Sequence, residues 1–305
     1  MRLRRAHTTH TKEKFAERGR PSRERANRVT GALDPGAISR DFDALMCDLD
    51  GVVYRGDSLI EGAPEAIRRL RERGVEVIFC TNNSRSTVNE YVAKLAGFGI
   101  DALDDDVLTS GAVTSEVLAA QGYTGKTAIV IGDRGVRDAL TSIGVVLNDD
   151  AASIAAEAVV VGWDVNFDYS TMRRVSSAVR NGAKLFATNR DSTFPAPEGL
   201  WPGAGAILAS IEVASGHTAE IVGKPHPPMM EAVGRRMSGA RRIAAVGDRA
   251  DSDLAGAVSM GWATILVLSG VTTRSEADDL RPAPDLVVDS LADLGRPAVS
   301  AGQRH

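Results

Sequence analysis

Two aspartates that stand two residues apart, Asp48 and Asp50, follow directly on the apolar run 44–47. A short apolar run that ends in polar residues is typical of a buried parallel strand whose carboxyl end opens into a loop, and ligands of open α/β sheets bind beside such ends. Side chains two residues apart on a strand share a face, so both carboxylates could meet one ligand if the extended backbone continues. Alternatively, one aspartate caps a helix and the other is solvated.

Three later segments also place polar residues directly after a predicted strand: 81–83, Lys224 and 248–253. Taken singly, each is compatible with an ordinary structural role. Thr81 or Ser84 could cap the next helix, and Lys224 could be a solvated surface lysine. The acidic segment could begin a helix or form a calcium-like loop, although it lacks the glutamate and the spacing of an EF-hand. Four polar strand ends in one α/β order favour a shared site.

The residue types at these four ends suit phosphoryl transfer. An aspartate can attack phosphorus to form an aspartyl-phosphate, and a divalent cation offsets the repulsion between that aspartate and the phosphate. Carboxylate ligands suit Mg²⁺. A second carboxylate, two residues on, can protonate the leaving group and later deprotonate water. Thr81, Asn82 and Lys224 could hold the transferring oxygens and offset their charge.

The elements that would position these residues alternate between strand and helix from residue 43 onward. This alternation predicts parallel βαβ units with right-handed crossovers, and the strands are too many for one compact sheet, so we expect two α/β units. The predicted strands are 43–48, 75–80, 106–109, 127–131, 158–161, 184–187, 220–222, 243–246, 263–268 and 286–288. The predicted helices begin near residues 63, 88, 111, 134, 170, 203, 227 and 252.

Length and composition are those of an ordinary globular protein. The chain has 305 residues, is 43% hydrophobic and 25% charged. No apolar run approaches the roughly 18 residues of a membrane span. Residues 1–30 carry ten Lys and Arg against three Glu, whereas the whole chain has a formal charge of −4. The acidic remainder is a poor candidate for non-specific nucleic-acid binding.

We expect residues 1–40 to form a disordered basic tail, because they contain few apolar residues and no sustained period. A secretory signal is disfavoured, since the apolar segment of such a signal is missing. The tail could instead be a transit peptide, an over-extended start, or an arm that binds nucleic acid or a membrane surface.

Cys47 and Cys80 are the only cysteines, and both lie in apolar runs directly before a candidate site residue. Two such cysteines argue against a disulfide scaffold and are consistent with a reducing cytoplasm. Strand alternation turns each thiol away from the side chain that follows it, so we interpret both as small buried strand residues. A redox-sensitive site is the alternative.

The four segments together resemble the motifs of the haloacid dehalogenase (HAD) superfamily in order and content. The matching stretches are DLDGVVYRG, TNNS, VGKP and GDRADSD. They look most similar to subfamily IIA, the NagD-type and nitrophenyl-phosphatase or phosphoglycolate-phosphatase-like proteins. The resemblance covers residues 43 to about 290. It implies a Rossmann-like parallel-sheet core with an inserted α/β cap domain of the C2 type.

The resemblance also implies roles for individual residues. Asp48 would be the nucleophile and Asp50 the general acid and base. Mg²⁺ would be bound by Asp48, the main-chain carbonyl of Asp50, and Asp248. Thr81 and Asn82 match the phosphate-binding positions of the family.

Three more positions belong to the implied site, and a fourth departs from the family pattern. Lys224 matches the motif lysine, and Asn83 supports the second motif. Asp253 matches the second acid of the fourth motif and would orient the metal-bound waters or Lys224. Arg249 stands where such proteins often have Asn, which leaves its contacts open.

The spacing of the motifs predicts where the cap is inserted. Lys224 follows Thr81 by 143 residues, which is enough for a whole additional domain. We expect core segments at 41–119 and 206–295, a cap at 120–205 and a short tail at 296–305. A cap excludes water and recognises the leaving group.

The segment 189–197, predicted as a loop of the cap, is our candidate for substrate recognition. Within it, Arg190, Asp191 and Phe194 are the candidate specificity residues. Phe194 could equally be an aromatic that packs within the cap.

The sequence thus predicts a cytoplasmic, Mg²⁺-dependent phosphomonoesterase that hydrolyses a small organic phosphate through an aspartyl-phosphate. Glycerol 3-phosphate and 2-phosphoglycolate are the first candidates, on resemblance alone, ahead of a nucleoside monophosphate or a cofactor phosphate. A phosphotransferase or mutase with the same intermediate is the main alternative. The paired aspartates argue against a signalling receiver domain, and the four intact motifs against a non-catalytic binding protein. A homo-oligomer is compatible with the sequence.

Overall fold

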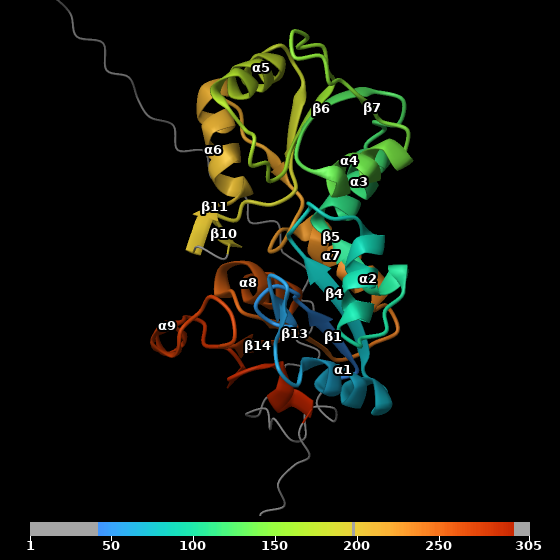
Figure 1. Cartoon of the computed structure of the whole chain (residues 1–305), viewed down its shortest axis with the longest axis vertical. Coiled ribbons are helices and arrows are strands. Elements are labelled where there is room, and N and C mark those ends of the chain that lie inside the picture. Colours follow the sequence, from blue (N-terminus) through green and yellow to red (C-terminus); the bar gives the residue numbers. More distant parts are fainter. Residues whose placement is uncertain (1–41, 197–198, 296–305) are drawn as a thin grey trace, which may run out of the picture.

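A computed structural model describes residues 42–196 and 199–295 as two α/β units, one above the other in Figure 1. The lower unit is built on a six-stranded sheet and the upper unit on a five-stranded sheet. Neighbouring strands within both sheets pair in parallel, and helices provide most of the connections that parallel pairing requires. The predicted α/β class, with a second α/β unit inserted into a parallel-sheet core, is confirmed.

The first sheet has the strand order β15-β14-β13-β1-β4-β5. These strands are β1 (Ala44–Cys47), β4 (Glu76–Thr81), β5 (Val107–Thr109), β13 (Ile243–Gly247), β14 (Ala263–Val267) and β15 (Leu286–Val288). The central strand β1 is fully buried and pairs with β13 on one side and β4 on the other. The carboxyl ends of these three strands therefore lie side by side.

Helices cover both faces of the first sheet. On one face, α1 (Ala63–Glu72), α2 (Val88–Gly97) and the short η4 (Leu291–Gly295) pack against side chains such as Leu45. On the other, α3 (Ser110–Ala120), α7 (Pro227–Arg236) and α8 (Ala255–Met260) pack against side chains such as Met46. Leu45 and Met46 are consecutive strand residues, so they point to opposite faces. The remaining short elements are β2 (Tyr54–Arg55), β3 (Ser58–Leu59), η2 (Asp104–Asp106), η3 (Ala250–Leu254) and α9 (Arg274–Asp279).

The second sheet has the strand order β12-β9-β8-β6-β7. These strands are β6 (Thr127–Ile131), β7 (Val146–Leu147), β8 (Ala158–Val161), β9 (Lys184–Ala187) and β12 (Glu220–Ile221). Its two faces are covered by α5 (Tyr169–Arg180) with α6 (Ala204–Ser215), and by α4 (Arg134–Ser142) with the end of α3. Helix α3 thus belongs to both units, because Val113 lies in a core of the first unit and Leu118 in a core of the second.

The predicted boundary between cap and second core segment, at residue 205, is wrong. Ile207, Leu208 and Ile211 of α6 lie in a core of the second sheet, and β12 pairs with β9 of that sheet. The strand before Lys224 was likewise predicted to belong to the core, whereas it belongs to the second sheet. Apolar periodicity identifies an element, but it does not say which of two sheets the element joins.

The segment predicted as a cap loop contains an antiparallel hairpin, β10 (Thr193–Ala196) and β11 (Gly199–Pro202), which lies at the boundary of the two units in Figure 1. Phe194 pairs with Trp201 across it. Prolines in both strands conceal the hairpin in the sequence, because proline argues against a strand unless the strand lies at an edge. The hairpin has only two strands, so each is an edge strand and can accommodate a proline.

The basic tail at 1–40 and the tail at 296–305 lie outside the described residues. Among the helices that the structure describes, none has both the length and the apolar content to cross a bilayer.

Candidate active site

The polar strand ends of the first sheet meet at one edge. Asp48 follows β1, Asp248 follows β13, and Thr81 ends β4, and these three strands are neighbours. Lys224 comes from the other direction, three residues after the last strand of the second sheet. The chain thus brings four separate segments to the junction of the two units.

Lys224 is the central cation of this junction. Its Nζ atom donates to Asp48 Oδ1 at 2.6 Å, to Asp253 Oδ1 at 2.7 Å and to the main-chain carbonyl of Cys80 at 2.8 Å. The side chain is 2% exposed, and burial alone would lower its pKa. The charges of Asp253 and Asp48 outweigh that effect and hold the pKa of Lys224 well above its usual value, so the lysine is charged.

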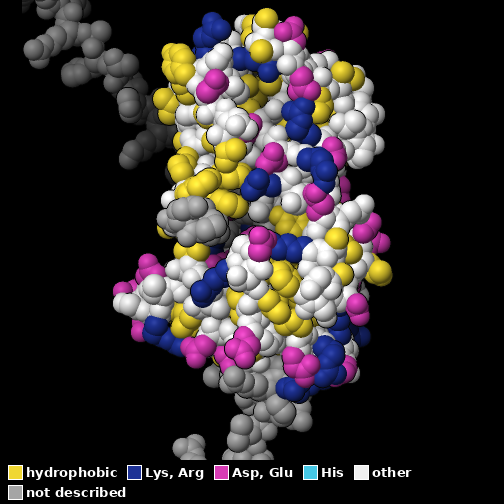
Figure 2. Space-filling view, in the orientation of Figure 1, with side chains coloured by type: hydrophobic (Ala, Val, Ile, Leu, Met, Phe, Trp, Pro, Cys, Tyr) yellow, Lys and Arg dark blue, Asp and Glu magenta, His cyan; other side chains and the backbone are white. Residues whose placement is uncertain are grey.

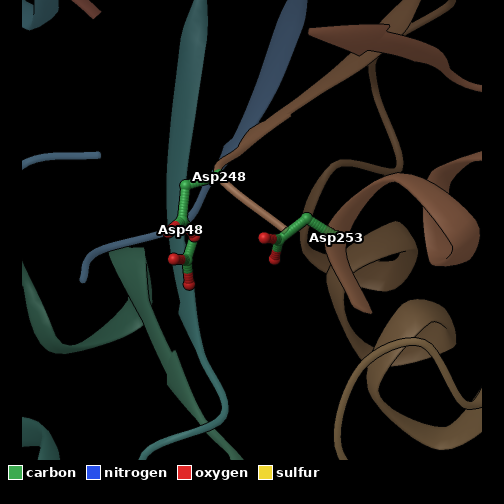
Figure 3. Close-up of side chains that lie close together, drawn as sticks. All are labelled: Asp48, Asp248 and Asp253. Atoms are coloured by element: carbon green, nitrogen blue, oxygen red, sulfur yellow. The ribbon is translucent and has the colours of Figure 1, made fainter. Parts of the chain in front are cut away.

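Three carboxylates crowd together around this lysine. Asp48, Asp248 and Asp253 each offer an oxygen within 4.8 Å of the others, and Figure 3 shows Asp48 together with Asp248 and Asp253, which both follow β13. Burial raises the pKa of Asp48 well above its usual value, and burial with the charge of Asp253 raises that of Asp248 to about 7. The single charge of Lys224 does not balance three buried carboxylates, so the site is suited to a further cation.

Asp253 is held at both of its oxygens. Oδ1 accepts from Lys224, and Oδ2 accepts from the main-chain N–H of Arg249 at 3.1 Å. The carboxylate lies so close to Gly247 that a Cβ there would meet the Asp253 Cβ at 2.2 Å. Asp253 therefore fixes Lys224 and the loop after β13.

Asp248 is anchored by a loop that follows β14. Its Oδ2 accepts from the main-chain N–H of Val271 at 2.6 Å, and its carbonyl accepts from Thr272 Oγ1 at 2.5 Å. A Cβ added at Gly270 would lie 1.9 Å from Asp248 Oδ2. This support was not predicted from the sequence, although Ser269 and Gly270 come directly after the predicted strand 263–268 and are residues typical of a loop.

Asp50 lies apart from the three-carboxylate cluster, in the loop after β1, and lines the same pocket. Its side chain is half-buried. Burial raises the pKa of Asp50 to about 6, against the opposing charges of Lys94 and Lys224. This carboxyl therefore keeps its proton to a higher pH than an ordinary aspartate does.

Asn82 connects the end of β4 to both of the segments that come from the second unit. Its Oδ1 accepts from the main-chain N–H of Lys224 at 2.7 Å, and its Nδ2 donates to the Lys224 carbonyl at 3.0 Å. The same Nδ2 lies 3.1 and 3.2 Å from the two carboxylate oxygens of Asp191. The Asn82 carbonyl accepts from Asn189 at 2.7 Å and from Ser110 at 2.6 Å.

Thr81 and Asn83 flank Asn82 and line the pocket with it. The Thr81 hydroxyl accepts from the main-chain N–H of Asn83 at 3.1 Å. The carbonyl of Asn83 accepts from the Tyr91 hydroxyl at 3.2 Å. This turn is therefore fixed from inside the first unit.

Two family models match the chain. A model described as haloacid dehalogenase-like hydrolase matches residues 45–146, and one described as HAD-hydrolase-like matches residues 221–294. An acid sugar phosphatase of Staphylococcus saprophyticus is 34% identical over 256 residues, which are 84% of this chain and 97% of that protein.

The chain belongs to the haloacid dehalogenase superfamily.

Other relatives agree with this assignment and are of the subfamily IIA type. A 5′-nucleotidase of Bacillus subtilis is 33% identical over 255 residues, covering 83% of this chain and 98% of that protein. A crystal structure of a glycerol phosphate phosphatase from Mycobacterium tuberculosis in complex with magnesium superposes with a TM-score of 0.77, at 30% identity, over 85% of this chain and 78% of that one. This HAD protein is a phosphoric monoester hydrolase, and the second α/β unit is its cap domain.

The cap contributes part of the pocket wall above the HAD site. Asp191 and Phe194, two of the predicted specificity residues, line the pocket. The third, Arg190, does not: its guanidinium pairs with Glu212 of α6 at 2.6 Å and is largely exposed. Consecutive side chains in this extended segment point in different directions, so a loop prediction could not distinguish them.

Trp163 and Arg249 are two of the pocket residues that were not assigned a role from the sequence. Trp163 follows β8 of the cap and stacks on Phe194 with ring centroids 4.5 Å apart. Its Nε1 donates to the Pro202 carbonyl at 2.8 Å, which ties it to the hairpin. Arg249 also lines the pocket, next to Asp248. Trp163 could have been predicted, because it stands two residues after the predicted strand 158–161, in the position where the other strand ends carry site residues.

Figure 2 shows hydrophobic side chains gathered around the hairpin, beside the boundary of the core and the cap. The apolar wall and the charged strand ends thus face a common pocket between the two domains.

Both cysteines are buried in the central strands of the HAD core. Burial raises the pKa of Cys80 to about 12 and lifts that of Cys47 further above its usual value. The thiolate, which is the reactive form, is therefore disfavoured at both positions.

Proposed function

We propose that this HAD hydrolase cleaves a small organic phosphate with Mg²⁺ through an aspartyl-phosphate on Asp48. The observation that carries the proposal is the position of Asp48, whose carboxylate is hydrogen-bonded to Lys224 at 2.6 Å and faces Asp248 within the three-carboxylate cluster. The cap, which we place between the end of α3 and β12, covers this site.

The donor set fits a magnesium ion. Asp48 and Asp248 supply carboxylate oxygens, and with Asp253 beside them three buried carboxylates share the single charge of Lys224. Oxygen-only donors select hard cations such as Mg²⁺. We expect the carbonyl of Asp50 to contribute as well. When bound, the ion neutralises charge between the attacking carboxylate and the phosphate.

The nucleophile is oriented before the substrate binds. Lys224 occupies Oδ1 of Asp48, which limits rotation of the carboxylate and leaves Oδ2 for in-line attack. Asp253 in turn fixes Lys224 at 2.7 Å. We assign Asp253 as a positioning residue that acts through the lysine.

Asp50 is suited to carry the proton. It lies in the pocket outside the carboxylate cluster, so its side chain is not needed for the metal. We propose that the protonated Asp50 donates to the leaving alkoxide in the first half-reaction. The resulting carboxylate then accepts a proton from the water that attacks the aspartyl-phosphate. A pKa of about 6 supports both halves of this cycle.

Thr81 is the group that we propose for holding a transferring phosphoryl oxygen, and Lys224, whose three N–H groups are donated within the protein, offsets the charge of those oxygens. Thr81 is 2% exposed, and its hydroxyl lies at the strand edge beside Asp48. Asn82 matches the same family motif, but its amide is already bonded to Lys224 and Asp191. We therefore assign Asn82 chiefly to holding the cap segments in register with the core.

Glycerol 3-phosphate and 2-phosphoglycolate are the first candidate substrates. Relatives are named acid sugar phosphatase, 5′-nucleotidase and glycerol phosphate phosphatase, which supports a small phosphate ester without selecting one. A nucleoside monophosphate or a cofactor phosphate is the second choice. Transfer to an acceptor alcohol through the same intermediate is the alternative reaction.

The test is phosphate release from a panel of phosphomonoesters with Mg²⁺, comparing the wild type with Asp48→Asn. We expect sustained multiple turnover by the wild type and loss of turnover in a folded Asp48→Asn protein. Substantial activity in that variant would refute the aspartyl-phosphate. Product analysis with and without an acceptor alcohol separates hydrolysis from transfer.

A further inference from the structure

Arg249 differs from every other charged group that lines the pocket floor. Its side chain is only 17% exposed, yet within the described part of the chain its guanidinium makes no hydrogen bond. The nearest ion-pair partner is Asp251, whose Oδ1 lies 3.5 Å from Nε and whose side chain is 76% exposed. Buried polar atoms are almost always hydrogen-bonded, so the buried and unpartnered Nε of this half-buried arginine is unusual and points to a missing ligand.

Arg249 and Lys224 differ in how many hydrogen bonds their side chains make. Both cations line the same pocket, but Lys224 is fully engaged by two carboxylates and a carbonyl. Arg249 follows Asp248 directly, and its main-chain N–H holds Asp253, so the backbone at this position is fixed while the side chain remains available. A guanidinium presents a planar fork of donors that matches a carboxylate or a phosphate.

We infer that Arg249 binds a carboxylate on the leaving group of the substrate. This inference rests on the proposed function and deepens it, because it favours carboxylated phosphate esters such as 2-phosphoglycolate over neutral polyol phosphates. The charges of the pocket favour a carboxylate over a second phosphate. Asp191 and Asp248 lie near the guanidinium, and one arginine can offset one added negative charge in such an acidic surrounding but not two.

Asp191 does not take the place of this ligand. Both of its carboxylate oxygens lie within 3.2 Å of Asn82 Nδ2, so it is directed toward the end of β4. No ion pair joins Asp191 to Arg249 among the residues that the structure describes. The pocket between them is bounded by the Phe194 ring, which gives the carbon chain of a short ester an apolar contact.

The experiment compares two pairs of substrates that differ only in this group. 2-Phosphoglycolate is paired with 2-hydroxyethyl phosphate, and 3-phosphoglycerate with glycerol 3-phosphate; in each pair a carboxylate replaces a CH₂OH group. kcat and KM are measured by phosphate release for the wild type, Arg249→Gln, Arg249→Lys and the matched control Arg190→Gln. Arg190 is an arginine of the cap whose side chain lies outside the pocket.

We expect the wild type to prefer the carboxylate member of each pair. Arg249→Gln should lower kcat/KM for that member by about 10- to 100-fold and change the neutral member by less than about 3-fold. Arg249→Lys should recover part of the selectivity, because it keeps the charge but loses the fork. Arg190→Gln should behave as the wild type.

Equal losses for both members of a pair would overturn the inference and assign Arg249 to the transferring phosphoryl group or to the balance of charge in the site. A wild type without preference for the carboxylate would overturn it as well. Failure of the wild type on every ester, including p-nitrophenyl phosphate, would instead refute the proposed function. Thermal unfolding of each variant identifies a folding defect, and Arg249→Lys then decides the selectivity.

Discussion

The strand edge beneath the pocket and the wall that the cap adds to it are held together by different kinds of contact. At the edge, Lys224 and Asp253 bond to each other and to a further protein group, with distances of 2.6 to 3.1 Å. In the wall, Trp163 and Phe194 contact each other through stacked rings, and Asp191 reaches the core through a single amide. The edge is a network of polar groups that hydrogen-bond to one another, whereas the wall is mainly an apolar surface with few directional contacts.

This difference separates two tasks. A reaction that forms and breaks bonds needs atoms held to a fraction of an ångström, which the network at the edge provides. Recognition of one ester among many needs a surface that can change without disturbing that network. We therefore expect substitutions at the edge to lower kcat for every substrate, and substitutions in the wall to change KM in a way that depends on the substrate.

The largest effect should follow Lys224→Met. Removing this cation leaves Asp48 and Asp253 buried without their partner, which should lower the free energy of unfolding by about 3–5 kcal/mol. The loss of the positive charge beside the transferring phosphate, and of the bond that orients Asp48, should lower kcat by at least about 10³-fold. Urea denaturation and phosphate release measure the two effects. Lys126→Met, at an exposed lysine of the cap, is the control, and a Lys224→Met protein with near-wild-type kcat would contradict the importance of the network.

A smaller loss is expected from Gly270→Ala, which touches no substrate. The new Cβ would lie 1.9 Å from Asp248 Oδ2, so either the loop after β14 or the Asp248 carboxylate must move. We expect a loss of about 1–3 kcal/mol in stability and a drop in kcat of about 10- to 100-fold. Higher Mg²⁺ concentrations should be needed for half-maximal activity. Gly97→Ala, where a Cβ meets no atom within 4 Å, should leave activity unchanged; if both variants behaved alike, the close packing around Asp248 would be irrelevant.

The strand edge was largely predictable from the sequence, and the wall was not. Asp48, Thr81 and Asp248 each follow or end an apolar strand, and a parallel sheet brings such ends to one edge whatever the details of packing. Lys224 was predicted at the same edge because it was taken to follow a strand of the core, but that strand belongs to the cap sheet. Its position depends instead on the bonds that Asn82 makes to its main chain.

The wall depends on features that leave weak local signals. The hairpin β10–β11 contains prolines in both strands, and which of its side chains face the pocket is decided by pairing with a distant segment. Arg190 and Asp191 are neighbours of similar polarity, yet only Asp191 lines the pocket. The contact of Trp163 with Phe194 joins residues of separate segments of the cap, and no pattern within either segment predicts it.

Asp191→Ala tests a polar link between the wall and the edge. Losing the acceptor for Asn82 Nδ2 removes a charge-assisted hydrogen bond, so the cap segment should be held less firmly over the core. We expect KM to rise by about 10-fold while kcat changes by less than about 3-fold. Asp191→Asn keeps an acceptor oxygen and should lie between the wild type and the alanine variant. An equal fall in kcat for both variants would instead assign Asp191 to the reaction itself.

The smallest effect is expected from Phe194→Leu. This change removes the ring stacked on Trp163, a contact worth about 0.5–1.5 kcal/mol, but keeps an apolar side chain of similar size at the pocket. KM should therefore change by about 2- to 10-fold, by different factors for different esters, while kcat stays within about 2-fold. Steady-state kinetics on the two pairs of esters used for Arg249 measures this, with Val213→Ala on the exposed face of α6 as the control. If Phe194→Leu lowered kcat by the same factor for every ester, the hairpin would act on the geometry of the strand edge, and the division between the two regions would be wrong.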